Sequence, residues 1–207
     1  DHCVLGAVEH RNLVSTISAI SHVAGEEILV VFSHTHGAGL MGLDRAGLPG
    51  GEHIPPYLER LGERAGALAK EALGSLVPTS IVYGQGRCAL GTHRDFWDGS
   101  QFVCGHNPGV PVDDTVVVVR ITAEDGNPIA TVVNYACHPT TLAWDNTLIS
   151  PDYIGATREL VERETGAPCL FLQGASGEIG PREGFVGDPA VADRNGRELG
   201  YAALSTL

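Results

Sequence analysis

Two β-branched runs joined by a short polar turn constrain the fold of this sequence most strongly. The segment "TVVVVRITAEDGNPIATVVNYACH" places these runs on either side of Asp125-Gly126-Asn127. An Asp-Gly pair flanked by strand-forming residues is the strongest short-range signal for a β-hairpin. The sequence therefore predicts two antiparallel strands, the second of which leads to His138.

Helical periodicity and further apolar runs surround this hairpin. Helices are predicted over about 9–24, 57–76, 151–166 (with Ser150 as N-cap) and 188–207. Buried strands are predicted over 27–33 and 167–173, and a further strand over 79–90. The glycine-rich and proline-rich stretches 37–56 and 91–114 are predicted to be irregular. Helices that alternate with buried strands are typical of an α/β layered domain with a mixed, mostly parallel sheet flanked by helices. We expect a single domain over 1–207, incomplete at both ends.

Composition excludes several classes of partner and site. The formal net charge of -12 disfavours nucleic acid and anionic membrane surfaces, which would repel the chain. No apolar run approaches the roughly 20 residues needed to cross a bilayer. The five cysteines are odd in number and form no CxxC pair, so neither a thiolate zinc site nor a disulfide framework is indicated. The sequence thus predicts a soluble protein and does not distinguish a cytoplasmic from a secreted one.

Histidines follow two of the predicted strands. In "VVFSHTHGAG", His34 and His36 are separated by one residue, so on an extended chain their side chains would point the same way. His138, in "CHPTT", ends the second strand of the hairpin. Neutral imidazole is a common zinc ligand, and a catalytic zinc takes three protein ligands and a water molecule. We interpret these histidines as a candidate zinc site at the carboxyl ends of the strands.

Other interpretations of the same residues stay open. A histidine at a strand end is most often simply hydrogen-bonded, and Arg94, in "GTHRDFW", could bind an anion or pair with a neighbouring aspartate. The turn "QGASGEIG" could cradle an anion through its backbone N–H groups, although it lacks the Lys-Ser/Thr ending of a nucleotide-binding loop. Two alternatives therefore remain, a metal-dependent ester or phosphoester hydrolase and a non-catalytic domain that binds a small ligand.

Three motifs together carry a family resemblance. In this order, "SHTHGAG", "NYACHPTTLAWDNTLISPDYIGA" and "LFLQGASGEIGPRE" resemble the catalytic N-terminal domain of the neutral/alkaline (non-lysosomal) ceramidase family, over about residues 1–183. The resemblance implies that His34 and His138 bind one zinc ion (Zn2+). It also implies that His36 lies beside the metal-bound water, and that Arg94 binds the reacting group of the substrate.

The resemblance further implies an activity. The sequence departs from the family pattern at two places, both next to the presumed substrate pocket. It implies a zinc-dependent amidohydrolase that attacks a linear amide (N-acyl) bond with a zinc-bound water. The substrate would be a small-molecule or lipid amide, either the sphingolipid ceramide or a related N-acyl compound. The family completes its zinc shell with a glutamate and a tyrosine that would lie beyond Leu207, so we expect this chain alone to hold metal weakly. Gly37-Ala38-Gly39 and Pro139-Thr140-Thr141 replace the family's usual Ser-Gly-Pro and Gly-Thr-Ser, next to the presumed pocket.

Overall fold

The computed structural model describes residues 1–207, which form two compact units. The sheet unit consists of Asp1 and residues 32–38 and 78–207, and the helical unit consists of residues 2–31 and 39–77. The single domain expected over 1–207 stays a prediction.

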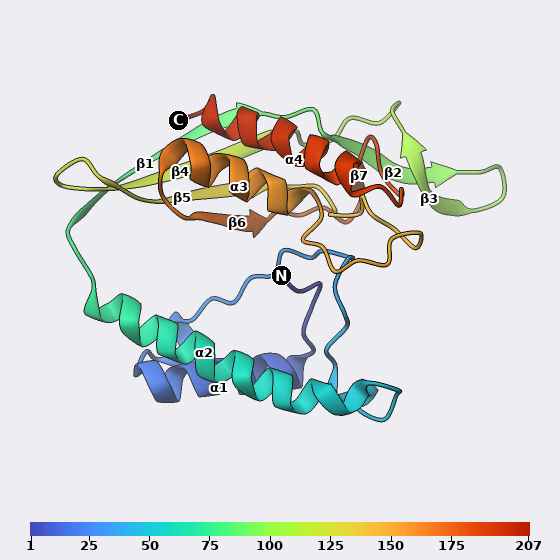
Figure 1. Ribbon diagram of the computed structural model, residues 1–207. Helices are drawn as coiled ribbons and strands as arrows, with labels where there is room; N and C mark the ends of the chain where they lie inside the picture. Colours follow the sequence, from blue (N-terminus) through green and yellow to red (C-terminus); the bar gives the residue numbers. More distant parts are fainter. The chain divides into compact units, whose positions relative to one another are not determined.

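The sheet unit contains two sheets (Figure 1). Four strands form the larger one, in the order β1 (Thr79–Arg87), β4 (Thr115–Ala123), β5 (Pro128–Tyr135) and β6 (Cys169–Gln173). The smaller one has the order β3 (Phe102–Asn107), β2 (Gly91–Trp97) and β7 (Ile179–Pro181). The predicted hairpin is confirmed as β4 and β5, whose turn includes Gly126 at φ 89°, a backbone conformation that glycine adopts readily.

The predicted mixed α/β sheet flanked by helices is confirmed, but more of its strand pairs are antiparallel than we expected. β1 pairs with β4 and β4 with β5 in antiparallel fashion, and β5 with β6 is the parallel pair. Antiparallel pairing thus predominates over the parallel pairing that we expected. The reason lies in the connections, because a tight turn joins β4 to β5, whereas a parallel pair needs a crossover such as the helix between β5 and β6.

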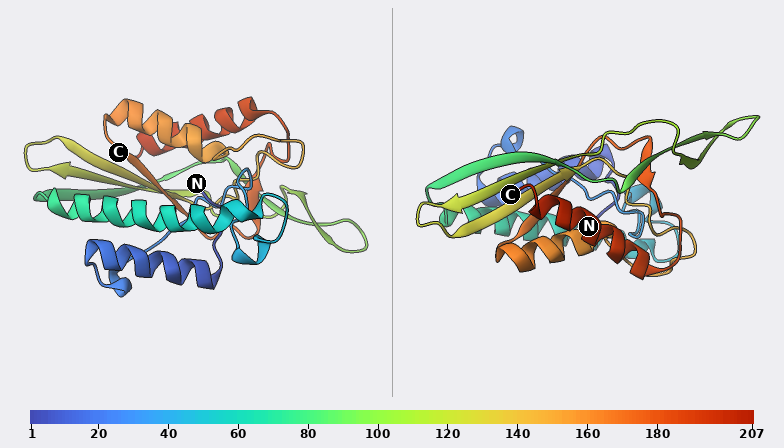
Figure 2. Two further views of the ribbon diagram at one scale, coloured as in Figure 1. Left: turned by 60° about the horizontal axis from the view of Figure 1, so that its bottom comes forward. Right: turned by 90° about the horizontal axis from the view of Figure 1, so that it is seen from above.

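Helices α3 (Tyr153–Thr165) and α4 (Pro189–Leu204) lie together on one face of the larger sheet (Figures 1 and 2). Their apolar sides and the facing strand residues form the core of the unit. It includes Val116, Val118, Val133, Tyr135, Tyr153, Ile154, Val161, Phe171 and Leu199. On β5, Val133 and Tyr135 are fully buried and alternate with the half-buried Val132 and Asn134, so the strand that precedes His138 has one side in the core.

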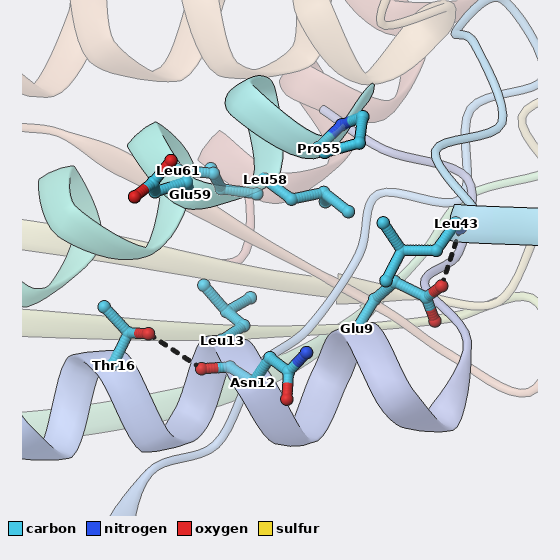
Figure 3. Close-up of a pocket in the computed structure, with 9 residues that line it drawn as sticks. All are labelled: Glu9, Asn12, Leu13, Thr16, Leu43, Pro55, Leu58, Glu59 and Leu61. Atoms are coloured by element: carbon cyan, nitrogen blue, oxygen red, sulfur yellow. Dashed lines mark hydrogen bonds between the residues drawn. The ribbon is translucent and has the colours of Figure 1, made fainter. Parts of the chain in front are cut away.

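The helical unit consists of α1 (Ala7–Ser21) and α2 (Ile54–Gly74) with the short 3-10 turns η1 (Gly25–Glu27), η2 (Leu43–Arg45) and η3 (Gly51–His53). Both long helices were predicted. Between them lies a cavity of about 270 Å³, whose lining combines leucines with polar side chains (Figure 3). Its buried Glu9 carboxylate accepts a hydrogen bond from the Leu43 backbone N–H at 2.8 Å, so this charge is satisfied within the unit. No helix of the protein combines the length and apolarity needed to span a membrane.

The secondary structure differs from the prediction in two stretches. The run 27–33 forms no strand, and its residues Leu29 and Val31 are exposed, because an apolar run indicates burial but supplies no partner strand. The stretch 91–114, predicted to be irregular, contains the β2–β3 hairpin. Its turn is closed by Asp98, whose carboxylate accepts hydrogen bonds from the Ser100 and Gln101 backbone N–H groups. We interpreted these turn residues as a loop, although they are also typical of hairpins.

Candidate metal centre

The position of His138 is determined by backbone groups of the turn after β6. Its backbone N–H donates to the Ile179 carbonyl at 2.8 Å, and its ring Nδ1 lies 2.6 Å from the Ser176 carbonyl oxygen. A carbonyl oxygen can only accept, so Nδ1 carries the proton and donates it. In the neutral ring the lone pair is then on Nε2. This is the usual arrangement of a metal-binding histidine, whose second ring nitrogen donates to a carbonyl or carboxylate.

The protonation of His138 also suits a ligand. The pKa of His138 is lowered to about 4, chiefly by burial. The Ser176 hydrogen bond acts in the opposite direction, and the positive charge of Arg94 and the two nearby histidines add to the lowering. The residue is 9% exposed. At neutral pH the imidazole is therefore uncharged, as metal binding requires.

His34 approaches His138 from a different part of the chain. The two Nε2 atoms lie 3.1 Å apart, and the ring centroids 4.7 Å apart. Two imidazole nitrogens on one tetrahedral zinc, each about 2.0–2.1 Å from the metal, would lie about 3.3 Å apart. The observed separation fits a shared cation with a small adjustment, and it equally fits a hydrogen bond between the two rings. The donor set is thus suited to zinc.

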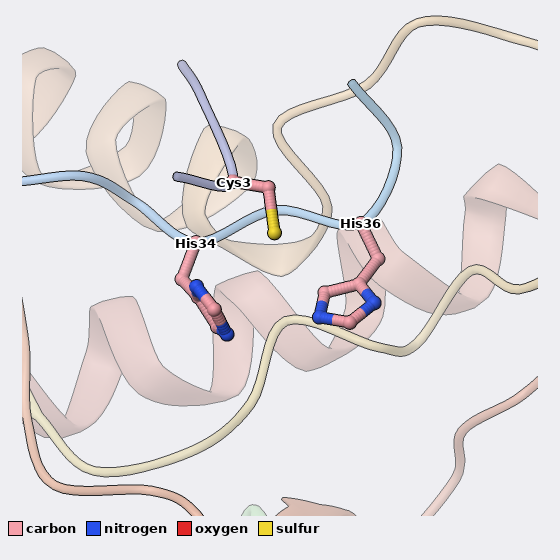
Figure 4. Close-up of side chains that lie close together, drawn as sticks. All are labelled: Cys3, His34 and His36. Carbon is pink, nitrogen blue, oxygen red and sulfur yellow. The ribbon is translucent and has the colours of Figure 1, made fainter. Parts of the chain in front are cut away.

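His36 completes a triangle of imidazoles. Its ring centroid lies 5.3 Å from that of His34 and 5.4 Å from that of His138. Figure 4 shows the His34 and His36 rings on the same side of their chain, as the one-residue spacing predicts, although this segment is not a strand. Burial lowers the pKa of His36, with His34 and Arg94 as further causes. His36 is therefore a neutral ring at pH 7 that can take up or pass on a proton.

Arg94 lies beside this triangle. Its Nε donates to the Gly177 carbonyl at 2.8 Å, and its Nη2 lies 3.5 Å from Nε2 of His138. It is therefore anchored to the turn after β6 rather than to Asp95 or Asp98. A guanidinium has donors only and cannot bind a cation, but its remaining N–H groups can bind an oxygen that gains negative charge.

The turn "QGASGEIG" has a different role from the anion cradle that the sequence left open. It presents the carbonyl oxygens of Ser176, Gly177 and Glu178 to His138, the Arg94 side chain and the Arg94 backbone N–H, respectively. An anion cradle would need N–H groups at this position. The turn therefore supports the histidine and the arginine.

Two buried hydroxyl groups without a hydrogen-bond partner lie close in sequence to the histidines. Ser33 precedes His34, Thr140 follows His138 by two residues, and the side-chain oxygen of each has no hydrogen-bond partner within the protein. Most buried polar atoms are paired, so unpaired ones indicate a place for a ligand or an ordered water molecule.

Sequence reasoning missed several supports of the site. The Cys137 carbonyl accepts hydrogen bonds from the Tyr153 hydroxyl at 2.6 Å and from Nε2 of Gln173 at 2.9 Å, which holds the residue before His138. Like the Ser176 contact, these bonds end on a backbone carbonyl. Because every residue carries such a carbonyl, the amino-acid sequence offers no signal for them.

Comparisons with known proteins place the fold. No protein-family model and no curated protein matches the sequence. Solved structures do match, and two of them have a TM-score of 0.71 over 96% of this chain: a ceramidase complexed with C2, at 17% identity, and the neutral ceramidase from Pseudomonas aeruginosa, at 16% identity. The chain spans about a third of the length of these proteins (33% and 34%). The fold is thus one that also occurs in neutral ceramidase structures.

Proposed function

We propose that the protein is a zinc-dependent hydrolase that cleaves a linear amide (N-acyl) bond, in ceramide or a related N-acyl compound. One observation carries this proposal. The Nε2 atoms of His34 and His138 converge to 3.1 Å while Nδ1 of His138 is committed to a carbonyl, in a fold shared with ceramidase structures.

His34 and His138 are the residues that would hold the metal. Zinc bound at such a site supplies a nucleophile from water at neutral pH and polarises a carbonyl group. The Ser176 carbonyl keeps His138 in the tautomer that offers Nε2, and the surrounding burial keeps the ring uncharged. Further ligands would come from outside this donor pair, since a catalytic zinc usually has three protein ligands.

Arg94 and His36 would act on the substrate. When an amide carbonyl is attacked, its oxygen gains negative charge, and the free N–H donors of Arg94 lie beside His138 where they can stabilise that charge. The leaving nitrogen needs a proton. His36 is neutral and lies within the imidazole triangle, so it can accept a proton from the attacking water and deliver it to that nitrogen.

An amide fits this site better than a phosphoester. Phosphoryl groups carry negative charge on several oxygens, and sites for them gather several cationic groups or two metal ions. Here one guanidinium faces the histidines. A single donor group of this kind suits the single oxygen of a carbonyl.

The test uses the whole polypeptide that contains this sequence, because the chain spans about a third of the related structures. Zinc content and hydrolysis of N-acyl amides and of aryl phosphates are measured for the wild type, His34→Ala and His138→Ala. His106→Ala is the matched control, since His106 is exposed on β3. We expect both site variants to lose zinc and amide hydrolysis while the control keeps both. Unchanged zinc content in His34→Ala and His138→Ala, or turnover of phosphates alone, would contradict the proposal.

A further inference from the structure

The two histidine-bearing turns are both attached to one short segment, Ser150–Asp152. On the His34 side, Oγ1 of Thr35 donates to the Ser150 carbonyl at 2.7 Å, and the Ser150 N–H donates to the Gly37 carbonyl at 2.9 Å. The Gly37 N–H in turn donates to Oγ1 of Thr35 at 3.1 Å. Thr35 is fully buried, at 0% exposure, between two histidines that face the site. Its hydroxyl thus closes the turn against Ser150.

The His138 side is attached through a carboxylate. Asp152 is 3% exposed, and its Oδ2 accepts from the Leu142 N–H at 2.8 Å while its Oδ1 accepts from the Tyr153 N–H at 2.6 Å. The first bond holds the chain four residues after His138, and the second caps helix α3. Asp152, rather than the expected Ser150, is therefore the N-cap, because its side chain reaches the first helical N–H.

Backbone strain marks the same segment. Asp152 has φ 56° and ψ -153°, a combination that is essentially restricted to glycine. His34, in the turn attached to this segment, has φ 62°. Such conformations persist only where the surroundings over-determine them, and they concentrate at functional sites. The two carboxylate bonds supply that constraint at Asp152.

Apart from the contact between the His34 and His138 rings, one direct backbone link joins the two turns, and it is weak. The His36 N–H points to the Pro139 carbonyl at 3.4 Å, which is long for a backbone hydrogen bond. The bonds of Thr35 and Asp152 to the segment Ser150–Asp152 and its neighbours are shorter than this backbone link.

We propose that Thr35 and Asp152 are positioning residues that lock both turns to Ser150–Asp152 and so set the separation of His34 and His138. The consequence for metal binding rests on the proposed function. The geometric claim does not, because it concerns the two rings whether or not a metal is bound.

The first experiment measures zinc affinity in the whole polypeptide. Thr35→Val removes the hydroxyl at nearly constant volume, and Thr35→Ser restores it. We expect about 10- to 100-fold weaker zinc binding for Thr35→Val, the usual effect of losing a residue that orients a ligand, and recovery to within about threefold of the wild type for Thr35→Ser. A merely structural role would not be rescued in this way. Wild-type affinity in Thr35→Val would overturn the proposal.

The same measurement on Asp152 has a matched control. In Asp152→Asn an amide donor replaces one of the oxygens that face two N–H donors, so one bond is lost. Asp188→Asn makes the same change at the N-cap of α4, where the side chain accepts from the Ala190 N–H at 2.9 Å. We expect about tenfold weaker zinc binding in Asp152→Asn only. Equal effects of the two changes would overturn the proposal for Asp152.

A metal-free readout separates this inference from the proposed function. Nitrogen-15 NMR of the histidine rings, recorded with a chelator, reports the His34–His138 contact and the Nδ1–H tautomer of His138. We expect Thr35→Val and Asp152→Asn to lose the ring–ring contact but keep the tautomer, which depends on Ser176. If the wild type binds no zinc, the proposed function is wrong. The NMR spectrum then still tests whether Thr35 and Asp152 set the separation of the two rings. Retention of the ring–ring contact in both variants would overturn the inference.

Discussion

The turn that carries His138 and the turn that carries His34 reach the same place by different means. His138 follows β5, which is buried in the core and paired on both sides, by β4 and β6. His34 follows no strand, and its turn is held by a few hydrogen bonds to Ser150. The position of His138 thus depends on the core, whereas the position of His34 depends on a few hydrogen bonds within and next to its turn. Substitutions in the core should therefore mainly lower the free energy of unfolding, whereas substitutions in the His34 turn should mainly weaken zinc binding.

The largest effect on stability is expected in the core beneath His138. Phe171, on β6, is 7% exposed and its ring lies edge-on to Tyr153 at 6.2 Å. Phe171→Ala should lower the free energy of unfolding by about 3–5 kcal/mol, measured by urea denaturation. Leu170→Ala, one residue earlier and 55% exposed, should cost less than about 1 kcal/mol. Similar losses in the two variants would show that β6 is not a core strand.

A change at Arg94 should separate turnover from metal binding. Without the guanidinium, the charge on the attacked carbonyl oxygen loses its donors, so we expect Arg94→Gln to lower kcat for N-acyl amides about 100- to 1000-fold. Zinc affinity should change less than about threefold, because Arg94 cannot be a ligand. Arg87→Gln, at an exposed guanidinium paired with Asp114 on the same unit, is the control and should keep wild-type kcat. Loss of zinc in Arg94→Gln would contradict the assigned role.

The pH dependence of stability should report the burial of His138. Its pKa is about 4 in the folded protein against an ordinary value of 6.5, so between these values the unfolded chain binds the extra proton. Stability is then fully present above pH 6.5 and falls as the pH drops toward 4, by about 3 kcal/mol at most. Urea denaturation at pH 7 and pH 4.5, with a chelator, measures this. His138→Gln should flatten the dependence, and an unchanged slope in that variant would rule His138 out as its source.

The smallest effect tests the local turn. A Cβ on Gly37 would lie 2.8 Å from the Ser150 carbonyl oxygen, so Gly37→Ala must displace the turn from its anchor. We expect about tenfold weaker zinc binding and a change in Tm of less than about 3 °C, since the core is untouched. Gly47→Ala adds the same methyl group where nothing lies within 4 Å, and should change neither quantity. A large drop in Tm for Gly37→Ala would mean that the turn belongs to the core after all.

The sequence predicted the elements with strong local signals, such as the hairpin around Gly126 and the helices. It failed at 27–33, where apolar residues alone could not supply a partner strand. At the site, too, the sequence predicted what depends on neighbouring residues and missed what depends on contacts formed in the folded chain. The one-residue spacing of His34 and His36 predicted that their rings share a side, but nothing in the sequence pointed to the strained backbone of Asp152. Its role depends on the Leu142 N–H, which it meets only in the folded chain.

Zinc K-edge X-ray absorption of the zinc-loaded whole polypeptide tests whether His34 and His138 hold one metal ion, as we propose. Imidazole ligands give a countable scattering pattern with nitrogen at about 2.0–2.1 Å from the metal. We expect two imidazoles in the wild type, one in His34→Ala, one in His138→Ala, and still two in His36→Ala. A wild-type spectrum without imidazole, or an imidazole count that His138→Ala leaves unchanged, would contradict zinc binding by these two histidines.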